Sequence, residues 1–342
     1  MGASTRPEKA LADFAPNQKK DLPIALKPQD CKGKTYIVTG ATGGIGYEAA
    51  KHLVRLGAAK VVVGARNAES GKSAKAAIET ETGRKDVVEV WPLDLASYGS
   101  VKAFARKVEG LDRVDALLLN AGASMAAWDV KEGNESHVTV NFVSNHLLAL
   151  LAFPCLRASA RKHGVKPRLV LVGSMGAFFL ADQVKRFPKE GILDDLNNKE
   201  KWQGDFNNRY VLTKLLEQFA ARELASLVPV SEAGVVVNLV DPGLCKTGLT
   251  RDLSVLQRAK AWLARAALGR TPEMGSRTLI HGIAAGEEAH GKYLTSCEIR
   301  EDHLPDWMTN ESGKAVQKQV WRELVEKLEK IQPGAATAVV PN

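Results

Sequence analysis

The chain of 342 residues is long enough for one large domain or two ordinary ones, and its 45% hydrophobic and 25% charged residues are typical of a soluble globular protein. The net charge of +8 could suggest a polyanionic partner, but no basic run exceeds Lys19-Lys20, so a nucleic-acid partner is not expected. A signal peptide and a transmembrane segment are not expected either, because residues 1–30 are polar and the longest apolar stretch, roughly Leu147 to Pro154, is short.

Residues 1–32 predict an arm that lies on the surface, since they are polar and carry four prolines. From Lys34 onward, short β-branched runs alternate with amphipathic segments of helical length. About seven strands are predicted, at Thr35–Val38, Lys60–Gly64, Val87–Pro92, Ala116–Leu119, Arg168–Gly173, Val235–Val240 and Lys292–Thr295. Helices are predicted at Ile45–Leu56, Ser70–Thr80, Ser97–Val108, Ser136–Ala160 (interrupted by Pro154) and Tyr210–Leu227.

This alternation indicates βαβ units and an α/β fold: a doubly wound parallel sheet of the Rossmann type, covered by helices on both faces. Ligands then bind at the carboxyl ends of the strands. No internal repeat or second core is evident, so residues 33–300 are expected to form one domain. Residues 301–342 follow as a C-terminal helix and tail, with an amphipathic helix at Glu311–Ile331 that packs over the sheet edge or a partner.

Two long connections stand out within the domain. Met175–Arg209 is polar but carries five aromatic residues, which argues against disorder, and a long connection in a compact domain is usually functional or disordered. Leu244–Gly269 follows the strand at Val235–Val240 and has apolar residues at helical spacing, namely Val255, Ala259, Trp262, Leu263 and Ala266.

The glycine-rich stretch Thr39–Gly46 follows the first strand and opens the first helix. Glycines there allow a tight turn and a close approach to a pyrophosphate, which binds at the helix N-terminus. A tight loop without a ligand is the alternative. In the first strand–turn–helix unit, the stretch predicts a dinucleotide site.

The end of the second strand bears on the choice of cofactor. Enzymes that use NAD usually carry an acidic residue about 20 positions after the glycines, to bind the ribose 2′-hydroxyl. Here the strand leads into Arg66 and Asn67. A guanidinium matches a 2′-phosphate, so NADP(H) is favoured, with a solvated surface arginine as the alternative.

Tyr210 and Lys214 are four residues apart in an apolar helical pattern, and therefore lie on one helix face. An ammonium close to a phenol lowers its pKa by roughly 1–3 units, toward the range in which it exchanges protons near neutral pH. The pair alone is weak evidence, because this spacing also arises by chance.

In their number and order, these motifs resemble those of the short-chain dehydrogenase/reductase superfamily, particularly its retinol-dehydrogenase-like branch with its fungal relatives. The similarity covers roughly Gly33 to Leu294. It implies a catalytic tetrad of Asn141, Ser174, Tyr210 and Lys214. The implied cofactor contacts are Gly40, Thr42, Gly43, Gly44, Ile45, Gly46, Arg66, Asn67, Asp94, Leu95, Asn120, Ala121, Gly122, Tyr210, Lys214, Pro242, Gly243 and Thr247.

The resemblance also implies roles. Tyr210 would donate a proton to a carbonyl oxygen, or accept one from an alcohol, while Lys214 lowers its pKa and binds the nicotinamide ribose. Ser174 would hold the substrate oxygen. Asn141 would anchor a water that relays protons to Lys214, and hydride would pass between the nicotinamide and the substrate carbon.

Simpler explanations stand beside these roles. Asn141 could be an ordinary helix residue, and Ser174 could merely end a strand. Asp94 could cap the helix that begins near Ser97, unless Ser97 itself is the cap. Neither the histidines nor the cysteines match a metal spacing, so no metal is expected. Two of Cys31, Cys155, Cys245 and Cys297 have apolar surroundings, which favours free thiols and a reducing, cytoplasmic location.

The spacing of Ser174 and Tyr210 departs from the family pattern. They are 36 positions apart, whereas the bare family core has a dozen or so. The extra Met175–Arg209 segment should cover the active site and line the substrate pocket together with Leu244–Gly269. This predicts a bulky, largely apolar ketone, aldehyde or alcohol as substrate.

The leading hypothesis is an NADP(H)-dependent ketoreductase of specialised metabolism, where fungal relatives of the branch commonly act. A general retinal or aldehyde reductase is the alternative within the class. A non-catalytic NADP-binding sensor or scaffold, or a redox-neutral dehydratase or isomerase, are the alternatives outside it. A monomer or homodimer is expected.

Overall fold

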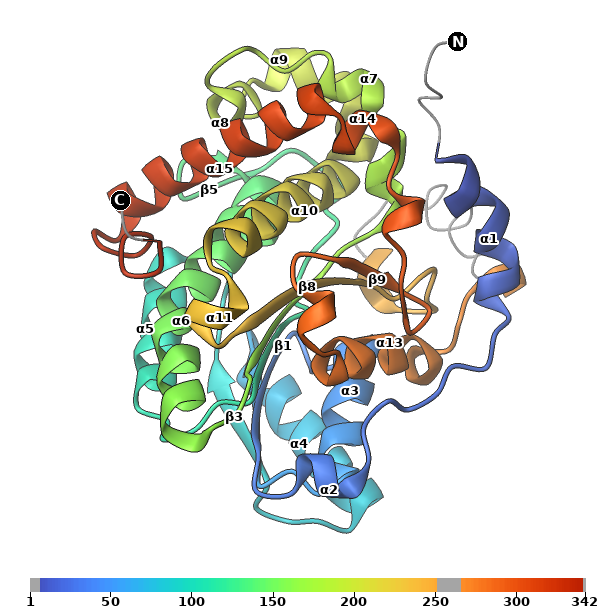
Figure 1. Cartoon of the computed structure of the whole chain (residues 1–342), viewed down its shortest axis with the longest axis vertical. Helices are drawn as coiled ribbons and strands as arrows, with labels where there is room; N and C mark the ends of the chain where they lie inside the picture. Colours follow the sequence, from blue (N-terminus) through green and yellow to red (C-terminus); the bar gives the residue numbers. More distant parts are fainter. Residues whose placement is uncertain (1–6, 251–265, 341–342) are drawn as a thin grey trace.

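The computed structural model describes residues 7–250 and 266–340 and shows an α/β fold in three layers (Figure 1). The apolar positions Val255, Ala259, Trp262 and Leu263 of the Leu244–Gly269 segment lie outside the described residues. The central sheet has the strand order β10-β9-β8-β7-β4-β1-β2-β3. Its strands are β1 (Thr35–Thr39), β2 (Lys60–Ala65), β3 (Val88–Pro92), β4 (Ala116–Leu119), β7 (Arg168–Val172), β8 (Val236–Asp241), β9 (Tyr293–Thr295) and β10 (Glu298–Ile299).

The prediction of a mostly parallel, Rossmann-type sheet is confirmed, with one strand more than the seven expected. The extra strand is β10, which pairs antiparallel with β9. The turn between them places Ser296 and Cys297 at positive φ, 52° and 60°. Two-residue turns of this kind usually carry Asn-Gly or Asp-Gly, so the sequence lacks the usual hairpin signal.

Two apolar layers pack against the two faces of the sheet, because strands such as β1 and β8 are buried along their whole length. One face carries α3 (Gly44–Arg55), α4 (Ala68–Thr82) and α13 (Pro272–Ala284). The other carries α5 (Tyr98–Glu109), α6 (Ser144–His163) and α10 (Arg209–Leu227), with α15 (Glu311–Ile331) packed outside α10.

The helix predicted at Ser136–Ala160 differs from expectation in one respect. Pro154 does not interrupt it; α6 continues through this residue to His163. The packing of Phe153, Cys155 and Leu156 in the core offsets the cost of the hydrogen bond that is lost at the exposed Pro154. The irregularity lies earlier, where Val138–Val143 form a π-helical turn, η1.

The combined helix Val138–His163 is long and apolar enough to cross a membrane by composition. Most of its apolar window, 83%, is buried inside the fold, as in a core helix. Before it, the sequence analysis missed a hairpin of β5 (Val130–Lys131) and β6 (Asn134–Glu135). Its turn residues Glu132 and Gly133 both have positive φ, and the glycine was the available signal.

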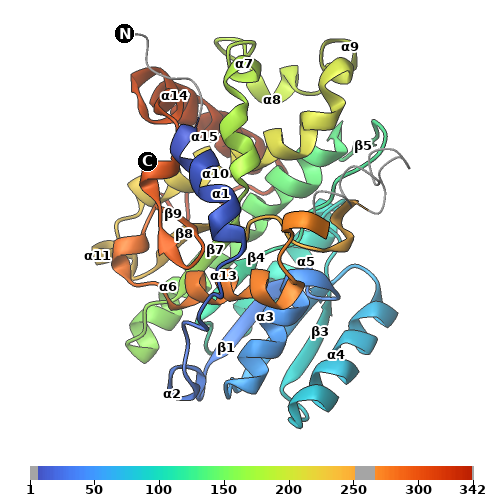
Figure 2. The same cartoon turned by 90° about the vertical axis from the view of Figure 1, so that its right-hand side faces the viewer.

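The N-terminal arm is helical over α1 (Glu8–Gln18) and lies along the outside of the domain before α2 (Pro28–Cys31) (Figures 1 and 2). Ala10 and Leu22 are buried where the arm docks. Nε2 of Gln18 donates to the carbonyl oxygens of Leu244 and Leu268, at 2.8 and 2.9 Å. The arm therefore holds both ends of the segment that follows β8.

The Met175–Arg209 connection is ordered as a series of short helices. They are η2 (Met175–Phe179), α7 (Ala181–Val184), α8 (Ile192–Asp195), α9 (Lys199–Trp202) and η3 (Gln203–Asn208). Its aromatic residues include the fully buried Phe178 and Trp202. Glu323 of α15 fixes the segment by accepting hydrogen bonds from the backbone N–H groups of Gly191 and Leu193.

The short elements that remain connect these parts. They are α11 (Val230–Ala233), η4 (Gly248–Thr250), η5 (Glu287–Ala289), η6 (Glu301–His303) and α14 (Asp306–Thr309). In Figure 2, α7, α8 and α9 lie at the end of the molecule opposite to α2. Because α2 leads into the amino end of β1, these helices stand at the carboxyl ends of the strands.

Candidate active site

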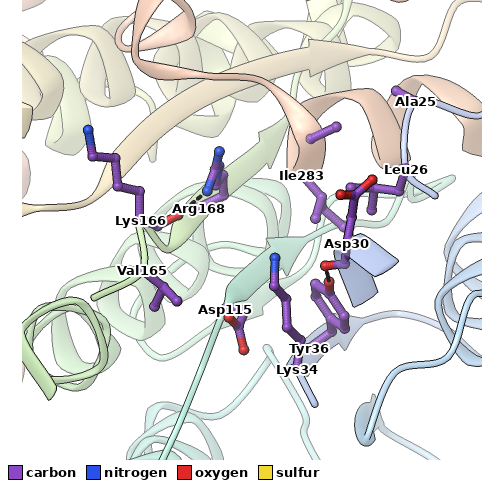
Figure 3. Close-up of a pocket in the computed structure, with 11 residues that line it drawn as sticks. Ala25, Leu26, Asp30, Lys34, Tyr36, Asp115, Val165, Lys166, Arg168 and Ile283 are labelled. Atoms are coloured by element: carbon purple, nitrogen blue, oxygen red, sulfur yellow. Dashed lines mark hydrogen bonds between the residues drawn. The ribbon is translucent and has the colours of Figure 1, made fainter. Parts of the chain in front are cut away.

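Two edges of the sheet could hold a ligand. A cavity of about 330 Å³ lies at the amino ends of β1, β4 and β7, lined among others by Lys34, Asp115 and Arg168 (Figure 3). In doubly wound sheets, however, ligands bind at the carboxyl ends. The predicted site residues all follow carboxyl ends or begin helices there, so the candidate site is at that edge.

The glycine-rich turn after β1 leaves room only for hydrogen at critical positions. A Cβ atom on Gly40 would lie 2.8 Å from Cα of Ala121, and one on Gly46 would lie 2.3 Å from Nδ2 of Asn120. Gly40 and Gly44 also have positive φ. These glycines let the turn pack tightly against the end of β4.

The first turn of α3 is open to an anion. Its N-cap residue, Gly43, makes no side-chain hydrogen bond to the helix, and Thr42 and Gly43 are exposed. Ile45 is half-buried against Gly275 of α13. A Cβ on Gly44 would lie 3.3 Å from Cγ2 of Thr247, which places that threonine beside the turn. Uncapped N–H groups and a hydroxyl fit a pyrophosphate.

Asn120 links the ends of the two central strands. Its Nδ2 donates to the carbonyl oxygens of Thr39 and Gly40, and the backbone N–H groups of Asn120 and Ala121 donate to Oγ1 of Thr39. The Asn120-Ala121-Gly122 stretch therefore fixes the position of the glycine-rich turn.

The residues predicted to contact the adenosine half lie beside this turn. Arg66 is exposed immediately after β2, while Oδ1 of Asn67 accepts a hydrogen bond from the backbone N–H of Ser70 and caps α4. Oδ1 of Asp94 accepts from the backbone N–H of Ala96. Leu95 is buried, and its carbonyl accepts from Ser144. Ser97, not Asp94, caps α5.

Tyr210 and Lys214 occupy the first turns of α10, as predicted from their spacing. Nζ of Lys214 lies 5.8 Å from the centroid of the Tyr210 ring and donates to the carbonyl oxygen of Val172 at 2.8 Å. Tyr210 is half-buried, whereas the lysine is 2% exposed. This arrangement places a buried positive charge next to a phenol that solvent and ligands can reach.

Ser174 follows β7 and caps η2, and its Oγ accepts from the backbone N–H of Gly176 at 3.2 Å. A Cβ on Gly176 would lie 2.7 Å from Cγ1 of Val211, so the serine turn packs directly against the first turn of α10. The structure thus brings Ser174 to the same end of α10 as Tyr210.

Asp241 joins this serine turn to the Pro242-Gly243 turn. Its carboxylate accepts from the backbone N–H groups of Met175 at 2.6 Å and Gly243 at 2.7 Å. The hydroxyl of the buried Tyr293 donates to it at 2.7 Å. This positioning role of Asp241 was not predicted from the sequence.

Asn141 sits in the π-helical turn and faces the same space. A Cβ on Gly122 would lie 3.2 Å from Oδ1 of Asn141 and 3.8 Å from Nζ of Lys214. The side-chain amide of Asn141 is bonded to both backbone groups of Ala123 and to Thr213. The backbone carbonyl oxygen of Asn141 accepts from Nδ2 of Asn145 at 2.9 Å.

The sequence analysis missed a carboxylate next to the lysine. Oε2 of Glu217 lies 2.6 Å from Nζ of Lys214, one helical turn along α10. Burial raises the pKa of Glu217 to about 7, although the lysine opposes this. Burial also lowers the pKa of Lys214, but the charges of Glu217 and Tyr210 leave it above its usual value. A charged residue at i+3 in an apolar helix was the available signal.

A second buried cluster was also missed. Nε and Nη2 of Arg209 donate to Oε2 of Glu135, at 3.1 and 2.8 Å, and Nη2 also donates to the carbonyl of Leu196. His137 accepts from the backbone N–H of Met125 at Nε2, so its proton is on Nδ1 and is donated to Glu135. This cluster ties the residue before Tyr210 to the β5–β6 hairpin and the Met175–Arg209 segment.

Within residues 7–250 and 266–340, no three His, Cys, Asp or Glu side chains gather in an arrangement that could hold a metal ion. All four cysteines are free, and Cys31, Cys155 and Cys245 are buried.

Comparison with known proteins places the chain among close relatives. A family model described as short chain dehydrogenase matches residues 34–184. The chain is 40% identical over 307 residues to the short chain dehydrogenase/reductase dmxR8 of Cryptosporiopsis sp., covering 89% of this chain and 93% of that protein. It is 35% identical over 346 residues to the short-chain dehydrogenase anuD of Penicillium roqueforti, covering 99% and 90%.

Solved structures share the fold. An RhlG/NADP active-site complex from Pseudomonas aeruginosa superimposes with a TM-score of 0.58 at 24% identity, covering 80% of this chain and 97% of that chain.

Proposed function

Because the chain belongs to the short-chain dehydrogenase/reductase family, we propose that it interconverts a bulky, apolar ketone or aldehyde with its alcohol, using NADP(H). Members of this family are oxidoreductases that bind a nicotinamide cofactor and act on small molecules. The observation that carries the proposal is the placement of Lys214 beside Tyr210 at the strand end where Ser174 and the open glycine turn also lie.

In this proposal, the site residues have separate roles in cofactor binding, substrate binding and proton transfer. The first turn of α3 and Thr247 would hold the pyrophosphate, and the nicotinamide, when bound, would supply or take up the hydride. Ser174 holds the substrate oxygen by a hydrogen bond. Tyr210 gives a proton to that oxygen in reduction and takes one in oxidation, while the Lys214 ammonium favours the phenolate.

The preference for NADP(H) rests on Arg66. It is exposed directly after β2, in the position from which a side chain reaches the adenosine ribose. Among the residues that the structure describes, no carboxylate forms an ion pair with it. Arg66→Ala is expected to raise the Michaelis constant for NADPH about 10-fold or more while sparing that for NADH, because a charged hydrogen bond contributes about 1.5–3 kcal/mol. An unchanged preference would reject the 2′-phosphate assignment.

The apolar substrate is supported by the aromatic Met175–Arg209 segment, which leads directly into Tyr210 and stands at the carboxyl ends of the strands. A role in specialised metabolism is supported by the resemblance to fungal members of the branch, and relatives from fungi are among those found. A cytoplasmic location belongs to the same proposal, and the four free thiols favour a reducing compartment.

The central test is turnover of NADPH with a panel of lipophilic ketones and aldehydes, followed by the absorbance of the reduced nicotinamide. Tyr210→Phe is expected to lower kcat about 100- to 10,000-fold, the usual contribution of a positioned general acid. Tyr36→Phe, at the amino end of β1, is the matched control and should leave kcat unchanged.

Other outcomes separate the alternatives. Turnover of retinal and other aldehydes but not of ketones favours a general retinal or aldehyde reductase. Tight NADPH binding without turnover of any carbonyl favours a sensor or scaffold. Product formation from a hydroxy compound with no net change in the nicotinamide favours a dehydratase or isomerase. Full activity of Tyr210→Phe rejects the proposed chemistry itself.

A further inference from the structure

The carboxylate of Glu217 faces the Lys214 ammonium from inside the protein. The two side chains are 0% and 2% exposed, and their charged atoms are 2.6 Å apart. Nζ of the lysine is thus much closer to this carboxylate than to the centroid of the Tyr210 ring, at 5.8 Å. A carboxylate in contact with the ammonium offsets part of the field that the ammonium exerts on the phenol.

Few other groups satisfy Glu217. Its Oε1 accepts a long hydrogen bond, 3.4 Å, from Nδ2 of Asn145, which also donates to the carbonyl oxygens of Ala121 and Asn141. The carboxylate thereby touches the same amide that contacts the π-helical turn. A buried carboxylate with so few donors exchanges its proton near neutral pH, in agreement with the pKa of about 7 for Glu217.

Resting on the proposed function, we propose that Glu217 is a positioning residue that offsets the charge of Lys214 and keeps Tyr210 protonated, the state in which Tyr210 can donate a proton to a carbonyl oxygen. When Glu217 is ionised, the phenol retains its proton and can donate it. When Glu217 is protonated or replaced by an amide, the ammonium acts on the phenol without an offset, and the phenolate required for alcohol oxidation becomes easier to form.

The other titratable groups around this pair are accounted for among the described residues. From α6, His146 is fully buried, and burial lowers its pKa to about 4, so it is neutral near pH 7. From β8, Asp241 bonds Met175, Gly243 and Tyr293. Four further charged groups have partners away from the lysine. On α10, Glu223 is bonded to Gln317 and Arg209 to Glu135. On α15, Glu323 is bonded to Gly191 and Leu193, and Lys327 to Asn134.

The test measures the ionisation of Tyr210 directly and needs no knowledge of the natural substrate. The protein with NADP⁺ is titrated from neutral to alkaline pH, and the phenolate absorbance is recorded for wild type, Glu217→Gln and Glu217→Asp. The same titration in the Tyr210→Phe background is subtracted, which isolates the signal of Tyr210. Glu223→Gln, a buried carboxylate on the same helix, is the matched control.

The midpoint of the Tyr210 titration is expected to fall by about one pH unit in Glu217→Gln, by less in Glu217→Asp, and not at all in Glu223→Gln. An unshifted midpoint in Glu217→Gln overturns the proposal. If that variant does not fold, Glu217→Asp decides, since its carboxyl is drawn back by one methylene and the shift must keep its sign.

Failure here is distinct from failure of the proposed function. An inactive Tyr210→Phe together with an unshifted midpoint leaves the oxidoreductase in place and removes only the role of Glu217. With any alcohol that the panel identifies, the pH profile of kcat gives a second measure. The alkaline limb of reduction and the acid limb of oxidation should both move to lower pH, by the same amount.

Discussion

Two buried ion pairs involve α10, Arg209–Glu135 and Lys214–Glu217, and the pKa values of their carboxylates are shifted in opposite directions. Both carboxylates are 0% exposed. Yet burial raises the pKa of Glu217 to about 7, whereas in Glu135 the same effect is outweighed by His137 and Arg209, and its pKa lies below the usual value.

The hydrogen-bond donors around the two carboxylates contribute to this difference. Glu135 accepts two hydrogen bonds from Arg209, one from the His137 ring and one from the His137 backbone. Glu217 has one ammonium and one long hydrogen bond. A carboxylate that accepts several hydrogen bonds stays ionised at every physiological pH and stabilises the fold. A carboxylate with few donors can exchange a proton and so change the charge next to a catalytic residue.

The largest effect should follow from breaking the saturated pair. Glu135→Gln leaves the buried Arg209 guanidinium, which cannot lose its proton, without the carboxylate to which it is bonded. We expect a loss of about 3–5 kcal/mol in the free energy of unfolding. Urea unfolding followed by tryptophan fluorescence measures it.

The matched change in the other pair, Glu217→Gln, should cost less, since Lys214 can release its proton. Equal losses in the two variants would show that the pairs do not differ as described, and a smaller loss in Glu135→Gln would reverse the comparison.

The second effect is the pH dependence of stability. A carboxyl whose pKa is raised in the folded state binds its proton more tightly there than in the unfolded chain, so its contribution is fully present below the unfolded pKa and is lost as pH rises through about 7. The stability of wild type relative to Glu217→Gln should therefore fall by at most about 3 kcal/mol between about pH 5 and about pH 8.

Glu135 should behave in the opposite sense. Its lowered pKa adds stability above the unfolded value that is lost on acidification. Unfolding curves at a series of pH values, with each Gln variant as the non-titrating reference, compare the two signs directly. A rising difference for Glu217 in the neutral range would contradict the comparison.

The smallest effect concerns the aromatic side of the saturated cluster. The guanidinium of Arg209 lies 5.2 Å from the Trp128 ring. Trp128→Leu is expected to cost about 1 kcal/mol of stability through this cation–π contact. A double-mutant cycle with Arg209→Met isolates the contact, and a coupling energy of zero would show that the tryptophan packs there without sensing the charge.

The sequence predicted what local pattern and motif order encode. The strands β1 to β4 and β7 to β9, the helices α3, α4, α5, α10 and α15, and the parallel sheet were predicted within a few residues. Buried parallel strands are apolar along their length, and amphipathic helices repeat every 3.6 residues, so both are visible in the chain itself.

Features that depend on contacts between distant parts of the chain were not predicted from the sequence. The partnership of Glu135 with Arg209 spans 74 positions, and no local pattern marks it. The uninterrupted helix at Pro154 depends on packing that overrides a local preference. The predicted site residues are gathered at one edge of the sheet, while their individual roles stay predictions until the variants above are measured.

The docking of the N-terminal arm has a consequence for how the chain is made. Gln18 bonds to backbone groups 226 and 250 positions away. During synthesis from the N-terminus, the arm therefore emerges long before its binding surface exists, and it must wait unpaired until most of the sheet has folded. The arm is thus made before Leu244 and Leu268, to which it bonds, and it reaches its place only after both have been made.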